Sequence, residues 1–265
     1  MKLAPTALTL IFALTPLSAL AEESGEGDTP PTSDPKAIAG EKPRANLGIA
    51  LNQDNFFGFY ATFQGTYRVL EPLDFAFYGI LWTIPAFGAG GGGSNLWTEF
   101  GVGARYRMFD DRLAIKPQVG ITNGSLLSSG ARGGAAGATT GPNFLDGVVP
   151  SLTLNYGDDR FEAEGYVGYY IAARRPEGNV TLDFLHFWGN AGVKFLDIFA
   201  VGAHYEQLRN TRNSGTNQAA DNYQWLGGYL QVSLPLGAVA RFTGGANVLP
   251  DAVGDFYKLS LGVNF

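Results

Sequence analysis

Hydrophobic residues alternate with polar or small residues over most of the chain, from residue 44 to the last residue. In residues 95–108, for example, the even positions include Phe100 and Val102, whereas the odd positions include Glu99. A period of two is typical of β-strands with unlike faces, because successive side chains point to opposite sides of a strand. Each such segment would form a strand with one apolar face and one polar or small face.

The alternation divides into twelve segments of 9 to 15 residues, long enough for the roughly 9–11 residues that a tilted strand needs to cross a membrane. They cover residues 44–52, 56–69, 73–84, 95–108, 112–123, 146–156, 160–174, 181–195, 198–210, 222–234, 238–248 and 254–265. The pattern therefore predicts an all-β fold.

The connections between these segments alternate in length. Short turns fall at Glu71-Pro72, Asp110-Asp111, Gly157-Asp158-Asp159, Asp197 and Pro235-Leu236-Gly237. Longer connections fall at residues 85–95, 123–145, 175–179 and 211–221. Short turns at one end and long loops at the other are typical of outer-membrane barrels with periplasmic termini.

We therefore expect residues 44–265 to form a single transmembrane antiparallel up-and-down β-barrel of about 12 strands, with short periplasmic turns and longer extracellular loops. The competing interpretation is a soluble lipocalin-like barrel or sandwich. Its strands have the same period of two, but their apolar faces point into the barrel or sandwich. The two folds therefore differ in whether the apolar side chains lie on the inside or the outside.

Composition and charge narrow the function classes. Only 16% of the residues are charged and 37 of 265 are glycine, which favours strands and turns over helices. The formal net charge is −6 without a basic block, so no nucleic-acid partner is expected. The chain has no cysteine, which excludes disulfides and thiolate metal sites, and we expect neither a cofactor nor a metal.

The first 43 residues differ from the rest. Residues 1–21 combine Lys2, a short apolar run and a final Ala-Leu-Ala, which predicts a secretory signal peptide cleaved after Ala21. An uncleaved membrane anchor is the alternative. Residues 22–43 are acidic and rich in proline, glycine and serine, which predicts a disordered leader, with a plug or partner-binding tail as the alternative. The expected location is the outer membrane, reached by export through the inner membrane.

The last segment alternates up to the C-terminal residue. Tyr257 and Phe265 lie on its apolar face. This resembles the terminal-strand signal of bacterial outer-membrane proteins, which implies that the barrel-assembly machinery recognises the segment. An unpaired amphipathic edge strand is suited to recognition by strand addition.

Several stretches resemble a family of Gram-negative outer-membrane β-barrel proteins of unassigned function. They are FYGILWT (77–83), WTEFGVG (97–103), PQVGITNG (117–124), HYEQLRNTRNSG (204–215) and YQWLGGY (223–229). The resemblance spans nearly all of residues 45–265. It implies the fold and the location, and it provides no catalytic residues to transfer.

The expected inner face carries charged residues in its periplasmic half. They are Arg68, Arg105, Arg107, Lys116, Glu162, Glu164 and Lys194. The alternation also places Asp74, Arg241 and Lys258 on the inner face. We expect opposite charges to face each other across the bore, with Lys194 beside Glu162 and Glu164 on one side and Arg105, Arg107 and Lys116 on the other. Such residues either pair to fill a narrow barrel or form a constriction that selects solutes by charge.

Aromatic and titratable residues gather nearer the extracellular end of the same face. They are Trp97, Glu99, Tyr166, Tyr170, His186, Trp188, His204 and Glu206. Aromatic faces beside polar groups bind flat solutes, although interface girdles and plugged lumens use the same residues. The histidines beside Glu206 suggest either a general base or hydrogen-bonded lumen side chains, and no catalytic residue is assigned.

The favoured function is a narrow outer-membrane channel for small polar solutes with a charged, aromatic-lined lumen. A non-conducting structural or surface-interaction barrel is the first alternative. A lipid-directed hydrolase that uses His186, His204 or Glu206 is the weaker one. The expected partners are outer-membrane lipid, the assembly machinery and a small polar solute.

Overall fold

The computed structural model describes residues 44–82, 97–124, 127, 143–173, 180–196, 198–250, 252 and 254–265. The predicted signal peptide and leader, and most of the three long connections at 85–95, 123–145 and 175–179, lie outside the described residues. Among the described residues, no helix is long and apolar enough to cross a membrane.

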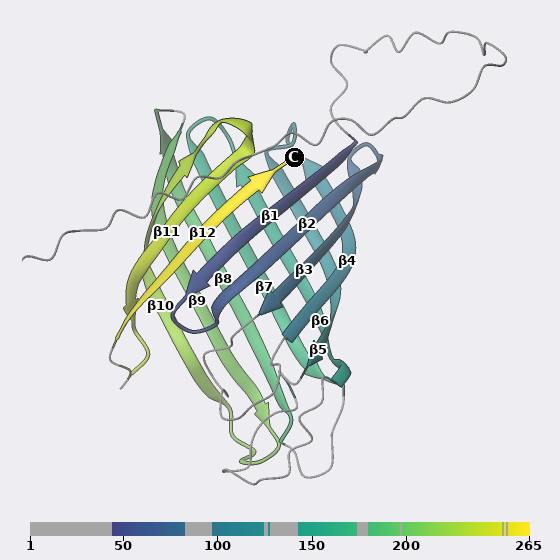
Figure 1. Ribbon diagram of the computed structural model, residues 1–265, viewed down its shortest axis with the longest axis vertical. Helices are drawn as coiled ribbons and strands as arrows, with labels where there is room; N and C mark the ends of the chain where they lie inside the picture. Colours follow the sequence, from purple (N-terminus) through teal and green to yellow (C-terminus); the bar gives the residue numbers. More distant parts are fainter. Residues whose placement is uncertain are drawn as a thin grey trace, which may run out of the picture. The chain divides into compact units, whose positions relative to one another are not determined.

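Twelve antiparallel strands pair in chain order, and the first pairs with the last to close a barrel (Figure 1). The prediction of a twelve-stranded antiparallel barrel is therefore confirmed. The strands are β1 (Ala45–Asp54), β2 (Gly58–Leu70), β3 (Leu73–Trp82), β4 (Trp97–Met108), β5 (Leu113–Gly124), β6 (Asn143–Gly157), β7 (Phe161–Ala172), β8 (Leu182–Phe195), β9 (Phe199–Asn213), β10 (Ala220–Ser233), β11 (Ala238–Asn247) and β12 (Asp255–Asn264).

One predicted loop is wrong in length. The polar connection expected at 211–221 is shorter, because β9 continues to Asn213 and β10 already begins at Ala220. Both strands carry polar residues on both faces there, so hydrophobic alternation stops before the backbone pairing does. The remaining turn is held by Asn213, whose side chain accepts hydrogen bonds from the amides of Gly215 and Thr216 at 2.9 and 3.2 Å.

The apolar face of the barrel lies on the outside. On β4, Val102 is 54% exposed, whereas Glu99 is fully buried on the inner face. On β12, Leu259 and Leu261 are likewise exposed. A continuous exposed apolar surface on a closed barrel is suited to lipid, because every strand is hydrogen-bonded and no edge is left unpaired. This orientation excludes the inverted, soluble interpretation.

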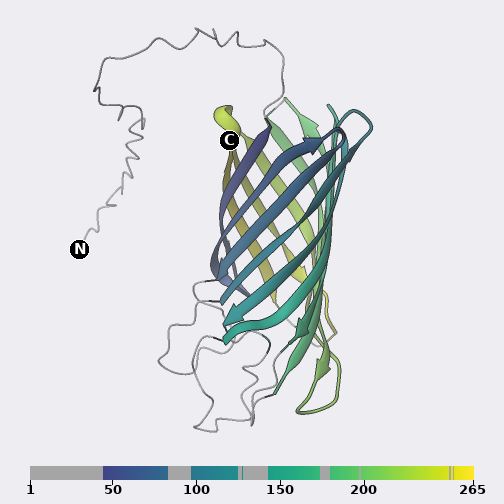
Figure 2. The same cartoon turned by 90° about the vertical axis from the view of Figure 1, so that its right-hand side faces the viewer.

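Short turns and the C-terminus lie at one end of the barrel (Figures 1 and 2). The turn between β6 and β7 is organised by Asp158, whose carboxylate accepts hydrogen bonds from the Tyr156 hydroxyl and from the amides of Phe161 and Arg160, all at 2.7 Å. These donors favour the ionised form and lower the pKa of Asp158 to about 2. The turn therefore depends on a charged carboxylate.

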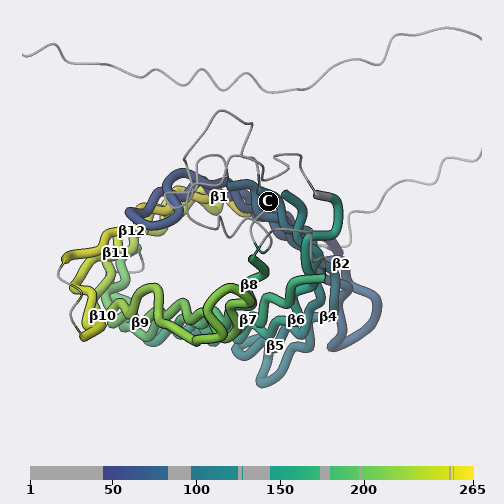
Figure 3. The backbone as a smooth tube through the Cα atoms, turned by 90° about the horizontal axis from the view of Figure 1, so that it is seen from below, coloured from purple at the N-terminus to yellow at the C-terminus, as the bar shows by residue number. Residues whose placement is uncertain are grey.

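The barrel has a flattened cross-section, with β1 and β12 on the wall opposite β8 and β9 and with β10 and β11 at one narrow end (Figure 3). Paired glycines allow this sharp bend. A Cβ on Gly227 would lie 2.2 Å from the carbonyl oxygen of Gly244, and one on Gly245 would lie 2.3 Å from that of Leu226. The flattening brings side chains of β12 within reach of β9.

Candidate functional site

The inner face of the barrel encloses two adjoining cavities. The first has a volume of about 370 Å³ and lies in the middle of the barrel. The second, of about 420 Å³, extends to Gly48 and Asn264 near the periplasmic ends of β1 and β12. Both are lined by Gln64, Glu164 and Arg241, so these polar side chains lie where the two cavities adjoin, whereas rings such as Phe63 and Trp82 also line the first cavity.

The extracellular end of this space is packed with aromatic rings. Tyr223 stacks on Trp225 with centroids 4.1 Å apart, and Trp225 stacks on Phe256 at 4.8 Å. Phe56, from the turn between β1 and β2, contacts Tyr223 at 4.6 Å, and Phe57 lies 6.5 Å from the same ring. We call Phe56, Phe57, Tyr223, Trp225 and Phe256 the aromatic cluster. It lies at the extracellular end of the polar lumen.

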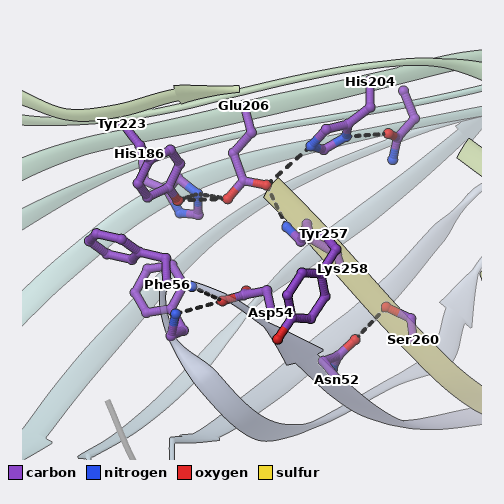
Figure 4. A network of polar contacts seen from close by, with 12 residues as sticks. Asn52, Asp54, Phe56, His186, His204, Glu206, Tyr223, Tyr257, Lys258 and Ser260 are labelled. Atoms are coloured by element: carbon purple, nitrogen blue, oxygen red, sulfur yellow. Dashed lines mark hydrogen bonds and ion pairs between the residues drawn. The ribbon is translucent and has the colours of Figure 1, made fainter. Parts of the chain in front are cut away.

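Asp54 holds the two phenylalanines in place. One of its carboxylate oxygens accepts hydrogen bonds from the backbone amides of Phe56 at 2.9 Å and Phe57 at 2.5 Å (Figure 4). An aspartate that binds backbone amides two and three residues ahead forms a local turn. Because Asp54 is buried at the end of β1, this turn places Phe56 against the inner wall instead of in solvent.

A buried carboxylate lies next to the aromatic cluster. Glu206 on β9 is fully buried and forms an ion pair with Lys258 on β12 (Figure 4). Its Oε1 accepts a hydrogen bond from the Tyr223 hydroxyl at 2.7 Å and lies 3.0 Å from His186 Nε2, while His204 Nε2 lies 3.3 Å from Oε2. The predicted upper-lumen residues His186, His204 and Glu206 thus lie together.

Further toward the periplasm, an ion pair crosses the lumen. Arg241 on β11 lies 2.6 Å from Glu164 and 3.6 Å from Glu162, both on β7. Tyr229 donates a hydrogen bond to Glu162 at 2.8 Å, and Asn190 donates one to Glu164 at 3.2 Å. Each glutamate therefore has the cationic Arg241 as an ion-pair partner and a neutral side chain as a hydrogen-bond donor.

At the periplasmic rim, the predicted arginines form ion pairs with nearby carboxylates. Arg107 forms ion pairs with Asp74 at 3.2 Å and with Glu71 and Asp111 at 2.8 Å, and Arg105 lies 3.7 Å from Asp74. Arg68 forms an ion pair with Glu71 at 3.3 Å. These arginines form their ion pairs along the rim and not with Glu162 or Glu164, because Asp74 lies directly beside Arg68 and Arg105 in the strand register.

The two predicted lumen lysines have no carboxylate within 4 Å among the described residues. Lys194 donates a hydrogen bond to the backbone carbonyl of Asp158 at 2.9 Å, and Lys116 donates one to the Gln64 side chain at 3.4 Å. Lys116 lines the mid-barrel cavity together with Glu164. It therefore contributes a positive charge to the cavity and has no ion-pair partner in the part of the chain that the structure describes.

The other predicted residues divide between the inner and the outer face of the barrel. Tyr166 and Trp188 stack at 5.9 Å and line the mid-barrel cavity. Trp97, Glu99 and Tyr170 are buried on the inner face. Tyr257 and Phe265 lie on the exposed outer face, and recognition of these two by assembly machinery stays a prediction.

Sequence reasoning missed several residues of the lumen. The sequence pattern did not assign Asp54, Phe56 and Phe57 to the lumen, because a short connection between two strands does not show whether its side chains point into the bore. Lys258 and Arg241 were expected on the inner face, but their partners were not identified. The one sequence signal for an inward turn was the presence of Phe56 and Phe57 in an otherwise polar connection.

The sequence pattern of a family described as "Family of unknown function (DUF6733)" matches residues 32–265. The chain belongs to DUF6733. No curated protein sequence matches this DUF6733 member. The family assignment thus agrees with the expected resemblance to outer-membrane barrels of unassigned function.

Solved structures similar to this DUF6733 barrel are bacterial outer-membrane proteins with low sequence identity. The KdgM porin has 11% identity and a TM-score of 0.45 over 83% of this chain and 99% of its own. The COG4313 outer membrane channel from Pseudomonas putida F1 has 11% identity and a TM-score of 0.49 over 88% and 99%. A loop-deletion variant of OmpT from Vibrio cholerae has 10% identity and a TM-score of 0.42 over 83% and 98%.

Proposed function

We propose that this outer-membrane barrel is a narrow channel for small polar solutes. The solutes enter its lumen from either side, and the aromatic cluster restricts their passage. The observation that carries the proposal is the pair of adjoining cavities inside the barrel. They share Gln64, Glu164 and Arg241 and together extend from the middle of the barrel to the periplasmic ends of the strands. A lumen lined by charged side chains selects solutes by size and charge.

The ion pairs across the lumen set an upper limit on solute size. Arg241 on β11 and Glu164 on β7 bridge the lumen at 2.6 Å, and Tyr229 reaches Glu162 at 2.8 Å. A solute must pass beside these pairs, since separating a desolvated pair costs several kcal/mol. The channel is therefore expected to conduct in small steps instead of the large ones of open porins.

Single-channel recording of the refolded protein in a planar bilayer tests this function. Discrete, stable steps of small size are expected from protein that shows the heat-modifiable mobility of a folded barrel. A salt gradient across the bilayer gives the ion preference. Absence of steps from folded protein, both for the wild type and after removal of the Phe56 and Phe57 side chains, would contradict the proposal.

A non-conducting barrel is the second candidate, and the aromatic cluster is the observation that favours it. Tyr223, Trp225 and Phe256 are buried, and Phe56 packs against them. If these rings close the lumen permanently, the protein acts through its outer surface alone. The two candidates differ in whether loosening the aromatic cluster produces a current.

The hydrolase alternative needs a nucleophile hydrogen-bonded to a histidine. Ser260, which lines the mid-barrel cavity, donates its hydrogen bond to Asn52 at 2.7 Å. His186 and His204 both face Glu206, whose charge Lys258 neutralises. Among the described lumen residues we find no serine–histidine hydrogen bond, so the geometry does not favour this function.

A further inference from the structure

One cation of the mid-barrel cavity has no carboxylate partner among the described residues. The described lining contains three cationic side chains, Lys116, Arg241 and Lys258. Arg241 lies 2.6 Å from Glu164 and 3.6 Å from Glu162, and Lys258 forms an ion pair with Glu206. Lys116 has no described carboxylate within 4 Å, and its ammonium group lines the cavity.

Lys116 is available to an incoming ligand. Its one hydrogen bond, to Gln64 Oε1, is long at 3.4 Å and involves a neutral acceptor. A carboxylate would form a shorter, charge-assisted hydrogen bond with this ammonium group. Because a partly desolvated lumen strengthens charge–charge contacts, Lys116 would attract a bound anion more strongly there than in water.

A ring-binding surface lies beside Lys116 in the same row of the barrel wall. The strand register places Lys116 next to Thr153, Thr153 next to Tyr166, and Tyr166 next to Trp188. Neighbouring strands are about 4.8 Å apart, so the backbones of Lys116 and Tyr166 are roughly 10 Å apart. The short side chain of Thr153 between them leaves room for a ligand.

The Tyr166 and Trp188 rings are arranged to receive a flat group. Their centroids are 5.9 Å apart, their planes differ by 21°, and both residues line the mid-barrel cavity. Aromatic surfaces bind planar rings by stacking or edge contacts. The cavity volume of about 370 Å³ falls within the range of roughly 300–1,000 Å³ that small-molecule sites occupy.

We propose that the wall formed by Lys116, Thr153, Tyr166 and Trp188 binds small aromatic monocarboxylates. Lys116 receives the carboxylate, and the Tyr166–Trp188 stack receives the ring. The inference deepens the proposed channel function, on which it rests, by naming the class of solute that the lumen selects. A neutral ring would lose the contact with Lys116, and a small anion without a ring would lose the stacking.

Calorimetric titration of the refolded full chain in neutral detergent tests the site independently of conduction. The probes are benzoate, its neutral amide benzamide, and acetate. We expect benzoate to bind at least tenfold more tightly than either of the others. Lys116→Gln should weaken benzoate binding at least tenfold, whereas Arg112→Gln, which removes an exposed turn cation, should leave it unchanged.

Two further variants keep the test decisive if Lys116→Gln fails to fold. Lys116→Arg should retain benzoate binding, and Trp188→Leu should bring benzoate down to the affinity of acetate. Equal binding of benzoate and benzamide, or full benzoate affinity in folded Lys116→Gln, would overturn the site. Lys116-dependent binding without any single-channel current would overturn the channel and leave the site standing.

Discussion

The Glu206 carboxylate is fully buried in the wall of a membrane barrel, where an unpaired charge is costly. Lys258 neutralises this charge from β12, and the Tyr223 hydroxyl donates a hydrogen bond to the same carboxylate at 2.7 Å. Lys258 reaches Glu206 across two intervening strands. The ion pair therefore fixes the spacing of opposite walls as well as balancing a charge.

Lys258→Met should lower the free energy of unfolding by about 3–5 kcal/mol, because it leaves the Glu206 carboxylate buried without its cation. Adding Glu206→Gln to the same chain should recover a large part of that loss, since the uncompensated charge is then removed. Equilibrium urea unfolding in lipid vesicles measures both effects. A Lys258→Met protein as stable as the wild type would show that the two histidines suffice as partners of Glu206.

At the residue scale, the sequence predicts which side chains face inward but not which of them meet. Period-two alternation placed Arg107, His204 and Lys258 on the inner face. Their partners depend on how far the barrel is flattened and on which acid lies adjacent in the register. Asp74, one strand away from Arg105, is therefore its ion-pair partner.

At the scale of elements, the sharp bend between β10 and β11 depends on glycine. Gly227→Ala should lower the free energy of unfolding by about 1–3 kcal/mol, because its Cβ would lie 2.2 Å from the backbone oxygen of Gly244. Gly189→Ala is the matched control, since its Cβ would have no neighbour closer than 3.6 Å. Urea unfolding of both variants checks this prediction, and equal stabilities would contradict it.

The turn between β6 and β7 should show its own pH dependence. The pKa of Asp158 is about 2 in the folded protein against an ordinary value of 3.8, so its contribution to stability is complete above about pH 4 and disappears as the pH falls toward 2. Asp158→Asn should remove this part of the acid dependence. Unfolding curves recorded between pH 2 and pH 5 measure it, and identical slopes in wild type and variant would refute it.

Strands could be predicted because lipid on one side and a polar lumen on the other impose a regular alternation. The positions of turns could be predicted only where this alternation is interrupted, so the conformation of a turn could not be predicted. The inward turn of Phe56 and Phe57 depends on the Asp54 carboxylate binding two amides, a local hydrogen-bonding choice that leaves no periodic trace in the sequence. The continuation of β9 to Asn213 escaped prediction because its outer part is polar on both faces.

At the scale of the whole barrel, the lumen has two chemically different parts. Stacked aromatic rings occupy the extracellular end, charged or hydrogen-bonding side chains line the periplasmic end, and the middle is lined by both kinds of side chain. The sequence predicted this division in outline, since aromatic and charged residues of the inner face separate along the strands. It could not predict how far the rings close the bore.

The central claim is that the lumen cavities form a channel and that the aromatic cluster narrows its extracellular end. Single-channel conductance of the wild type and of a Phe56→Ala/Phe57→Ala double variant tests it most directly, with heat-modifiable mobility as the check that both proteins are folded. We predict small steps for the wild type and steps at least severalfold larger for the double variant, because the two removed rings pack at the extracellular end of the lumen. Equal conductance in both folded proteins, or no current from either, would contradict the claim.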